Sequence, residues 1–275
     1  MNPAPKRVEI PPFPGGKRIA VTTSFDDGVV EDRRVVAAFN EWGLKGTFNL
    51  NSGGLDGKGH IAASEVSSLY RGHEVAVHTV THPHLPKLDS TQIAREVLDD
   101  RIALEDLVGY PVRGMAYPFG TYNPMVIDCL RQLGIVYARS TENAGNCFPP
   151  TEPLAWKTTA HQYAREPDTV PERFAKLCEN PNYSGVFFIW GHTYEFDRKN
   201  DWPSFERIYR PLAGKPDVWY CTNIELFDYE AARHRLVIAA NRATAFNPSA
   251  LPVTLCADGK LVVIPPGQTT PLPAA

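Results

Sequence analysis

Residues 18–28 read Arg18-Ile19-Ala20-Val21-Thr22-Thr23-Ser24-Phe25-Asp26-Asp27-Gly28, an apolar run that ends in two adjacent carboxylates. The run predicts a buried strand, and carboxylates at the end of a buried strand cost free energy unless other groups compensate them. Parallel α/β folds place their chemistry at the carboxyl ends of their strands. A helix cap followed by an Asp-Gly turn explains the same residues. The choice between the two interpretations depends on what the rest of the chain supplies.

The composition is that of a globular protein with one main core. The chain has 275 residues, of which 43% are apolar and 21% charged, and this length suits a single (β/α) barrel. The net charge of −3 and the lack of a basic block argue against nucleic acid as a partner. No apolar run is long enough for a membrane span. Residues 1–14 contain no apolar signal core, so we expect a cytoplasmic protein, or a secreted or cell-surface one if a leader has been trimmed.

Strand-like and helix-like segments alternate about seven times between residues 18 and 234. Residues 90–108 show helical spacing of apolar residues, and residues 186–190 form a continuous apolar run typical of a buried parallel strand. The alternation predicts an α/β fold built as a distorted or incomplete (β/α) barrel over residues 18–234. Residues 1–17 are expected to be an N-terminal extension. Residues 235–275 are expected to be a C-terminal β-rich appendage with a poorly ordered tail from Thr269.

Two histidines follow the third predicted strand in the segment His78-Thr79-Val80-Thr81-His82. Histidines four residues apart on a helical turn can bind one ion from the same side. Together with one carboxylate they form a three-ligand site suited to zinc, cobalt, nickel or iron. His84 is a rival for the second ligand, but Pro83 interrupts any turn that would align it, so we favour His78 and His82.

Two further segments lie at the ends of predicted strands. The turn at residues 117–120 is stiffened by proline and glycine, and its amide groups can face a ligand; it equally fits an ordinary turn before a helix capped by Asn123. His192 follows the end of an apolar strand, a position that suits a general acid because its surroundings can shift the pKa of the imidazole. The alternative for His192 is a core histidine with its hydrogen bonds satisfied.

Taken together, these segments resemble the polysaccharide deacetylases of carbohydrate esterase family 4, which share the NodB homology fold. Residues 24–28 resemble the first motif of that family, and residues 78–82 resemble its second motif, H-[ST]-x-x-H. Residues 117–123 resemble a variant of the third motif, and His192 resembles the histidine of the last one. The resemblance covers about residues 18–230 in the family's order.

The resemblance implies a role for each matching residue. The implied ligands of one divalent transition metal, most often zinc but also cobalt, nickel, iron or manganese, are Asp27, His78 and His82. The implied general base and general acid are Asp26 and His192. The implied substrate and oxyanion contacts are Tyr117, Pro118, Phe119 (through its backbone amide) and Gly120.

The chain departs from the family pattern in two places. Ala116 stands where the family has an arginine that orients the catalytic aspartate, and the nearest replacements are Arg113 and Arg139. No Asp-Trp motif is present to pair with His192, and the available substitutes are Glu195, Asp197 and Asp228. Arg139 and Trp190 are our candidates for side chains that support the catalytic groups.

The implied reaction is removal of acetyl groups from N-acetylated amino sugars in a poly- or oligosaccharide. Several aromatic residues near the strand ends could stack on sugar rings, and we expect only about a third of them to do so: Tyr117, Phe119, Tyr122, Trp190, Tyr194, Phe196 and Trp202. The alternatives are an O-acetyl esterase acting on xylan and an allantoinase-like hydrolase of a small non-sugar amide. A non-catalytic carbohydrate-binding homologue ranks last, because all the implied catalytic and metal-binding residues are present.

Overall fold

The structure is a computed structural model that describes residues 5, 7–145, 147–165 and 168–273. Its main body is a nine-stranded sheet in which the strand order is β7-β6-β5-β4-β3-β2-β9-β8, with β10 paired to β2. Every pairing in this sheet is parallel. The strands are β2 (Ile19–Asp26), β3 (Thr47–Leu50), β4 (Glu74–Val77), β5 (Gly114–Ala116), β6 (Tyr137–Asn143), β7 (Trp156–Thr158), β8 (Ala160–His161), β9 (Gly185–Gly191) and β10 (Val218–Tyr220).

The two ends of this sheet are joined by a very short piece of chain. Only Thr159 separates β7 from β8, and its backbone N–H donates to the carbonyl of Phe188 in β9 at 2.9 Å. The chain therefore passes directly from one edge of the sheet to the other and closes it. The predicted α/β class and the distorted barrel are confirmed.

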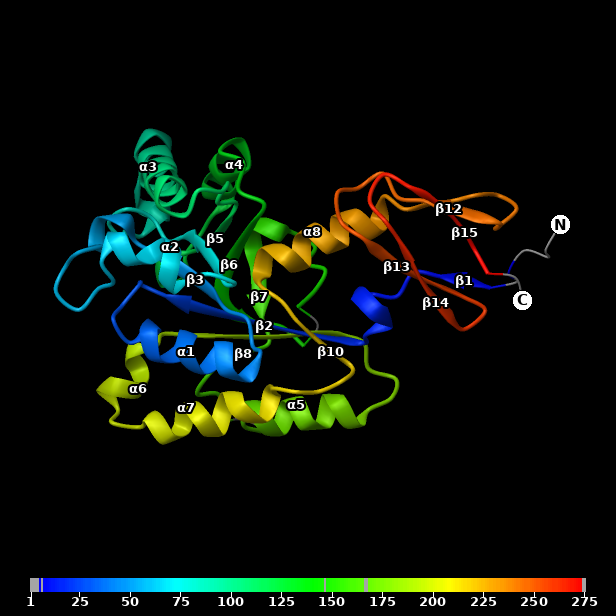
Figure 1. The fold of residues 1–275 in the computed structure, drawn as a ribbon. Helices are drawn as coiled ribbons and strands as arrows, with labels where there is room; N and C mark the ends of the chain where they lie inside the picture. Colours follow the sequence, from blue (N-terminus) through cyan, green and yellow to red (C-terminus); the bar gives the residue numbers. More distant parts are fainter. Residues whose placement is uncertain (1–4, 6, 146, 166–167, 274–275) are drawn as a thin grey trace.

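Helices follow most of the strands and cover the outside of the sheet, with α1, α5 and α7 along one side and α3 and α4 on another (Figure 1). The helices are α1 (Asp32–Trp42), α2 (Val66–Leu69), α3 (Ser90–Val108), α4 (Pro124–Gln132), α5 (Val170–Glu179), α6 (Tyr194–Arg198), α7 (Trp202–Tyr209) and α8 (Asn223–His234). Short 3₁₀ turns connect them: η1 (Pro14–Gly16), η2 (Ser52–Gly54), η3 (Ala63–Glu65), η4 (Leu85–Lys87), η5 (Pro118–Gly120), η6 (Pro153–Ala155) and η7 (Arg210–Leu212). In none of the described helices does length combine with the apolarity that a membrane span requires.

The appendage lies at one end of the molecule, beyond α8 (Figure 1). It consists of two antiparallel three-stranded sheets. One contains β11 (Val237–Ile238), β12 (Thr244–Phe246) and β15 (Thr269–Pro271); the other contains β1 (Val8–Glu9), β13 (Val253–Ala257) and β14 (Lys260–Ile264).

Described segments near both ends of the chain take part in the appendage. The prediction of a poorly ordered tail from Thr269 is wrong, because β15 pairs with β12 over three residues. Strand β1, within residues 1–17, pairs with β13. Residues Val8–Glu9 and Thr269–Pro271 thus make their ladder hydrogen bonds with strands of the appendage.

Candidate functional site

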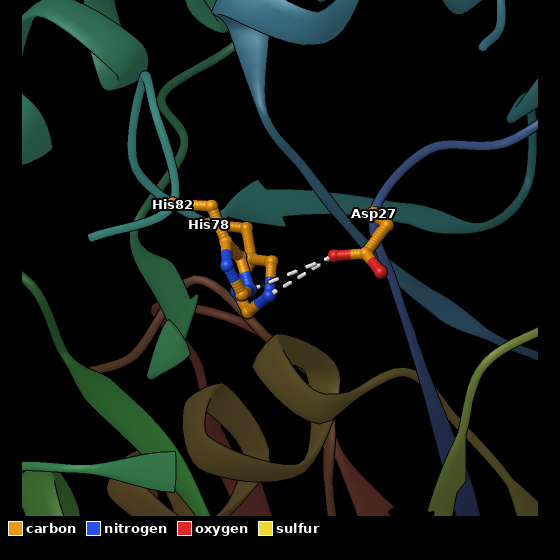
Figure 2. Close-up of side chains that lie close together, drawn as sticks. All are labelled: Asp27, His78 and His82. Atoms are coloured by element: carbon orange, nitrogen blue, oxygen red, sulfur yellow. Dashed lines mark ion pairs between the residues drawn. The ribbon is translucent and has the colours of Figure 1, made fainter. Parts of the chain in front are cut away.

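The carboxylate and the two histidines predicted to bind metal converge just beyond the carboxyl ends of β2 and β4. The carboxylate Oδ1 of Asp27 lies 3.5 Å from Nε2 of His78 and 3.7 Å from Nε2 of His82. Figure 2 shows the two imidazole rings side by side, facing the carboxylate. One ligand atom from each residue lies within 4.8 Å of the other two. Two imidazoles and one carboxylate are a common donor set for a catalytic transition metal.

The loop that carries the two histidines is not the helical turn that the spacing suggested. Thr79 has φ = 70° and His82 has φ = 57°, so left-handed residues, rather than an i, i+4 helical relation, bring the rings together. The Thr79 hydroxyl accepts the backbone N–H of His82 at 3.0 Å. His84, the rival ligand, instead stacks on Phe119 with ring centroids 3.9 Å apart.

His78 is held for ligation by two neighbouring elements. Its Nδ1 lies 2.8 Å from the carbonyl oxygen of Ala116, so Nδ1 carries the proton and Nε2 is free to bind an ion. The carboxylate of Asp100, in α3, accepts the backbone N–H of His78 at 3.0 Å. Burial lowers the pKa of His78, which favours the neutral imidazole that a metal requires.

Asp26 is buried and paired with Arg139, which lies on β6. One guanidinium nitrogen of Arg139 donates to both carboxylate oxygens, at 2.6 and 2.5 Å, and the Asn49 amide donates to Oδ1 at 2.8 Å. Burial raises the pKa of Asp26, but Arg139 and the nearby histidines outweigh it and lower the pKa to about 2. Arg113, the other candidate for this position, forms its ion pair with Asp228.

His192 points one ring nitrogen toward the two aspartates and the other away from them. Nε2 lies 3.9 Å from Oδ2 of Asp26 and 4.0 Å from Oδ2 of Asp27. Nδ1 lies 3.3 Å from Oε1 of Glu195. Burial lowers the pKa of His192, but the bond to Glu195 and the charges of Asp26 and Asp27 outweigh it and raise the pKa above its ordinary value.

Two of the three acidic candidates for pairing with His192 lie elsewhere. Asp228 is bound to Arg113. Asp197 accepts from the indole of Trp202 at 3.4 Å. Glu195 is therefore the acidic partner of His192 among the three.

The turn η5 borders the same site. Phe119 has φ = 58° and is 53% exposed, and its ring lies 4.5 Å from that of His82 between centroids. Gly120 cannot carry a side chain, because a Cβ there would lie 2.3 Å from the Thr141 hydroxyl. Pro118 and Tyr117 are buried, and the Tyr117 hydroxyl donates to the carbonyl of Leu154 at 2.6 Å, so only Phe119 presents its side chain at the surface.

Backbone strain is concentrated around the site. Eight described residues other than glycine have positive φ, and four of them border the site: Asp27, Thr79, His82 and Phe119. Left-handed backbone is unfavourable for these residue types and persists where the surroundings impose it, often at functional sites.

Several supporting residues were not predicted from the sequence. Asp100 lies on the buried face of α3, in register with Ile93, Val97 and Leu104, and a carboxylate in an otherwise apolar stripe is a readable signal. Asn49 is a polar side chain in the middle of the fully buried β3, which is a similar signal. His161 and Gln162 carry no such signal, because β8 has only two residues.

Comparison with known proteins shows what part of the barrel is similar to. Residues 14–138 match the family model described as polysaccharide deacetylase. Over 130 residues the chain is 30% identical to the peptidoglycan-N-acetylglucosamine deacetylase PgdA of Listeria monocytogenes, which covers 45% of this chain and 27% of that protein. The chain thus spans about a quarter of the length of this curated relative.

Two solved structures support the fold. A protein from Mycobacterium smegmatis assigned to the polysaccharide deacetylases superposes with a TM-score of 0.60 at 17% identity, covering 85% of this chain and 96% of its own. The Xyl-CE4 domain of a multidomain xylanase from the hindgut metagenome of Trinervitermes trinervoides gives 0.53 at 16% identity, covering 78% and 92%. The NodB-type barrel is therefore confirmed.

Proposed function

We propose, from the premise that residues 14–138 match the polysaccharide deacetylase family, that the chain is a metal-dependent hydrolase that removes acetyl groups from N-acetylated amino sugars in a poly- or oligosaccharide. The observation that carries the proposal is the convergence of Asp27, His78 and His82 within 4.8 Å. The N-acetylglucosamine named for the Listeria relative supports the choice of sugar.

The donor set fits a divalent transition metal, with zinc as the leading candidate and cobalt, nickel, iron or manganese as alternatives. The bond from His78 to the Ala116 carbonyl leaves Nε2 free on the side of Asp27. When bound, such an ion acidifies water and polarises an acyl oxygen. Three protein ligands leave positions open for these two oxygens.

Asp26 and His192 are the proton-transfer groups in this proposal. The pKa of about 2 keeps Asp26 ionised at neutral pH and able to accept a proton, although as a weak base it suits only an already acidic water. Nε2 of His192 lies 3.9 Å from Oδ2 of Asp26, so the proposed base and acid lie close enough to act on the same substrate group. His192 donates the proton that the departing amine needs.

Phe119 is the residue proposed to contact both reacting group and sugar. Its backbone amide would stabilise the oxyanion, and one such donor contributes on the order of 3 kcal/mol in comparable enzymes. Its exposed ring is available for stacking on a sugar face. Of the other aromatic residues predicted for this role, Phe196 is buried and Trp202 packs on Phe205 with centroids 5.8 Å apart.

The test is acetate release from N-acetylglucosamine oligomers, measured as purified, after chelation, and after addition of single metals. We expect activity to disappear on chelation and to return with zinc or another of these ions. Parallel assays on acetylated xylan and on cyclic ureides identify the alternative reactions. Full activity after complete removal of metal, or activity on ureides alone, would contradict the proposal.

A separate experiment tests the roles proposed for the two aspartates, Asp26 as general base and Asp27 as metal ligand. Replacing Asp26 by Asn should lower turnover by at least about 10²-fold, as expected for loss of a general base, while metal content measured by atomic spectroscopy stays at the wild-type level. Replacing Asp27 by Asn should lower metal content instead. A metal-free Asp26→Asn protein that is still folded by circular dichroism would show that Asp26 is a ligand.

A further inference from the structure

A second cluster of titratable side chains lies directly behind His192. His161, His192 and Glu195 have ligand-type atoms within 4.8 Å of one another. We propose that Glu195, fixed by His161 and Gln162, is a positioning residue that holds His192 with Nε2 directed toward Asp26 and Asp27. This inference rests on the proposed function, because it concerns the group assigned there as general acid.

Glu195 is the centre of this cluster. Its Oε1 lies 3.3 Å from Nδ1 of His192. Its Oε2 lies 3.3 Å from Nε2 of His161 and accepts the Gln162 amide at 2.6 Å. The two carboxylate oxygens therefore face different partners, and both are engaged.

The partners of Glu195 are themselves fixed. The Gln162 amide also donates to the carbonyl of His192 at 2.9 Å, and its oxygen accepts the hydroxyl of Tyr209 at 3.0 Å. Gly191 makes room for it, because a Cβ at that position would lie 2.3 Å from the Gln162 side chain. Gln162 thus binds both the backbone carbonyl of His192 and the side chain of Glu195.

The fold explains why this support is rigid. His192 and Glu195 lie three residues apart where β9 passes into α6, whereas His161 lies on β8, paired with β9. The His161 residue pairs with Trp190 in that register. The short segment that closes the barrel therefore also supports the proton donor.

The chemical role follows from the direction of the ring. As the C–N bond of the substrate breaks, its electron pair goes to nitrogen, and the proton on Nε2 of His192 transfers to that nitrogen. The ring keeps its second N–H on Nδ1, donated to Glu195. A neutral amide in place of Glu195 has one acceptor oxygen for three donors, so the ring would lose both its charge partner and its fixed orientation.

The test measures two substrates with different leaving groups on three proteins: wild type, Glu195→Gln and the control Glu206→Gln. Glu206 is an exposed glutamate on α7. N-acetylglucosamine oligomers release an amine that must be protonated, whereas 4-nitrophenyl acetate releases a phenolate that needs no proton. For Glu195→Gln, kcat on the oligomers should fall by about 10²-fold, the lower range for general acid catalysis. Hydrolysis of 4-nitrophenyl acetate should fall by less than about threefold, and Glu206→Gln should change neither.

Replacing His161 by Phe should give a smaller loss with the same selectivity, since only one contact to Glu195 is removed. Equal losses on both substrates in Glu195→Gln would show a merely structural role and overturn the inference. Metal analysis supplies a second criterion. Two ions bound to the wild type, falling to one in His161→Phe, would also overturn it, because the cluster would then be a second metal site. If the metal-loaded wild type hydrolyses neither substrate, the proposed function fails, and the inference fails with it.

Discussion

At the scale of single residues, the contact between Arg139 and Asp26 is a buried ion pair. Both side chains are buried, with Arg139 at 0% and Asp26 at 3% exposure. Arg139 also lies over the Trp190 ring, with its guanidinium carbon 4.7 Å from the ring centroid. The guanidinium keeps Asp26 ionised in a place where an unpaired charge is costly. The arginine thus serves both folding and the proposed chemistry.

We predict that Arg139→Met destabilises the protein by about 3–5 kcal/mol at neutral pH, the range for removing one partner of a buried ion pair. The measurement is urea unfolding followed by circular dichroism. The double variant Arg139→Met/Asp26→Asn should recover much of the loss, because no charge is left buried without its partner. A double variant as unstable as the single one would show that packing of Arg139, rather than charge, dominates.

At the scale of elements, the turn η5 combines backbone strain with an exposed apolar ring. Phe119 adopts a left-handed conformation at φ = 58° while its side chain is 53% exposed, so burial of the ring does not explain the residue. Asparagine tolerates this backbone region better than phenylalanine. The ring also packs on His82 and His84, and we propose that Phe119 contributes to ligand contact rather than to stability.

The prediction is that Phe119→Asn keeps the wild-type stability or gains up to about 1 kcal/mol, while KM for N-acetylglucosamine oligomers rises. Thermal unfolding and steady-state kinetics measure the two effects. Tyr122→Phe, which removes only the hydroxyl bonded to Glu142, serves as an aromatic control on the same segment. A clear loss of stability without a change in KM would make Phe119 a packing residue.

The elements differ in how far the sequence predicts them. The helix at residues 90–108 is confirmed to the residue, and the apolar run at residues 186–190 lies within β9, since periodicity and apolar runs are local signals. Strand β8 and helix α6 were not predicted, because segments of two and five residues carry no period. His161 lies on β8 and Glu195 on α6, so the sequence did not predict that these two residues meet.

The proposed metal ligands could be predicted from the sequence, whereas the residues that support them could not, because they depend on contacts between distant parts of the chain. The three proposed ligands stand in recognisable local motifs, so their convergence could be expected from the order of parallel strands. Arg139 is 113 residues away from Asp26 in sequence, and β3, β4 and β5 lie between β2 and β6 in the sheet, so only the curvature of the closed sheet brings the two side chains together. The left-handed loop at residues 79–82 was likewise hidden, because a spacing of four fits a helical turn equally well.

At the scale of the whole molecule, a buried carboxyl group joins strands and helix at the end of the barrel opposite the site. Glu74, the first residue of β4, accepts hydroxyl donors from Tyr137 at 2.7 Å and Thr47 at 2.9 Å. It also accepts the backbone N–H of Ile224, in the first turn of α8, at 2.9 Å. Burial, only partly offset by these bonds, raises the pKa of Glu74 to about 7.

The raised pKa of Glu74 predicts a stability that declines with pH. From the ordinary value of 4.5 up to about 7 the folded state keeps a proton that the unfolded state has lost, so stability falls as the pH rises through this window. Glu74→Gln does not titrate, and the free energy of unfolding of wild type relative to this variant should therefore drop by about 3 kcal/mol from pH 4.5 to 7. Urea unfolding at a series of pH values measures the difference, with Glu206→Gln as the exposed control. A difference that stays constant over the window would mean that Glu74 ionises in the folded barrel as readily as in the unfolded chain, and that the contacts from β3, β6 and α8 compensate its charge fully.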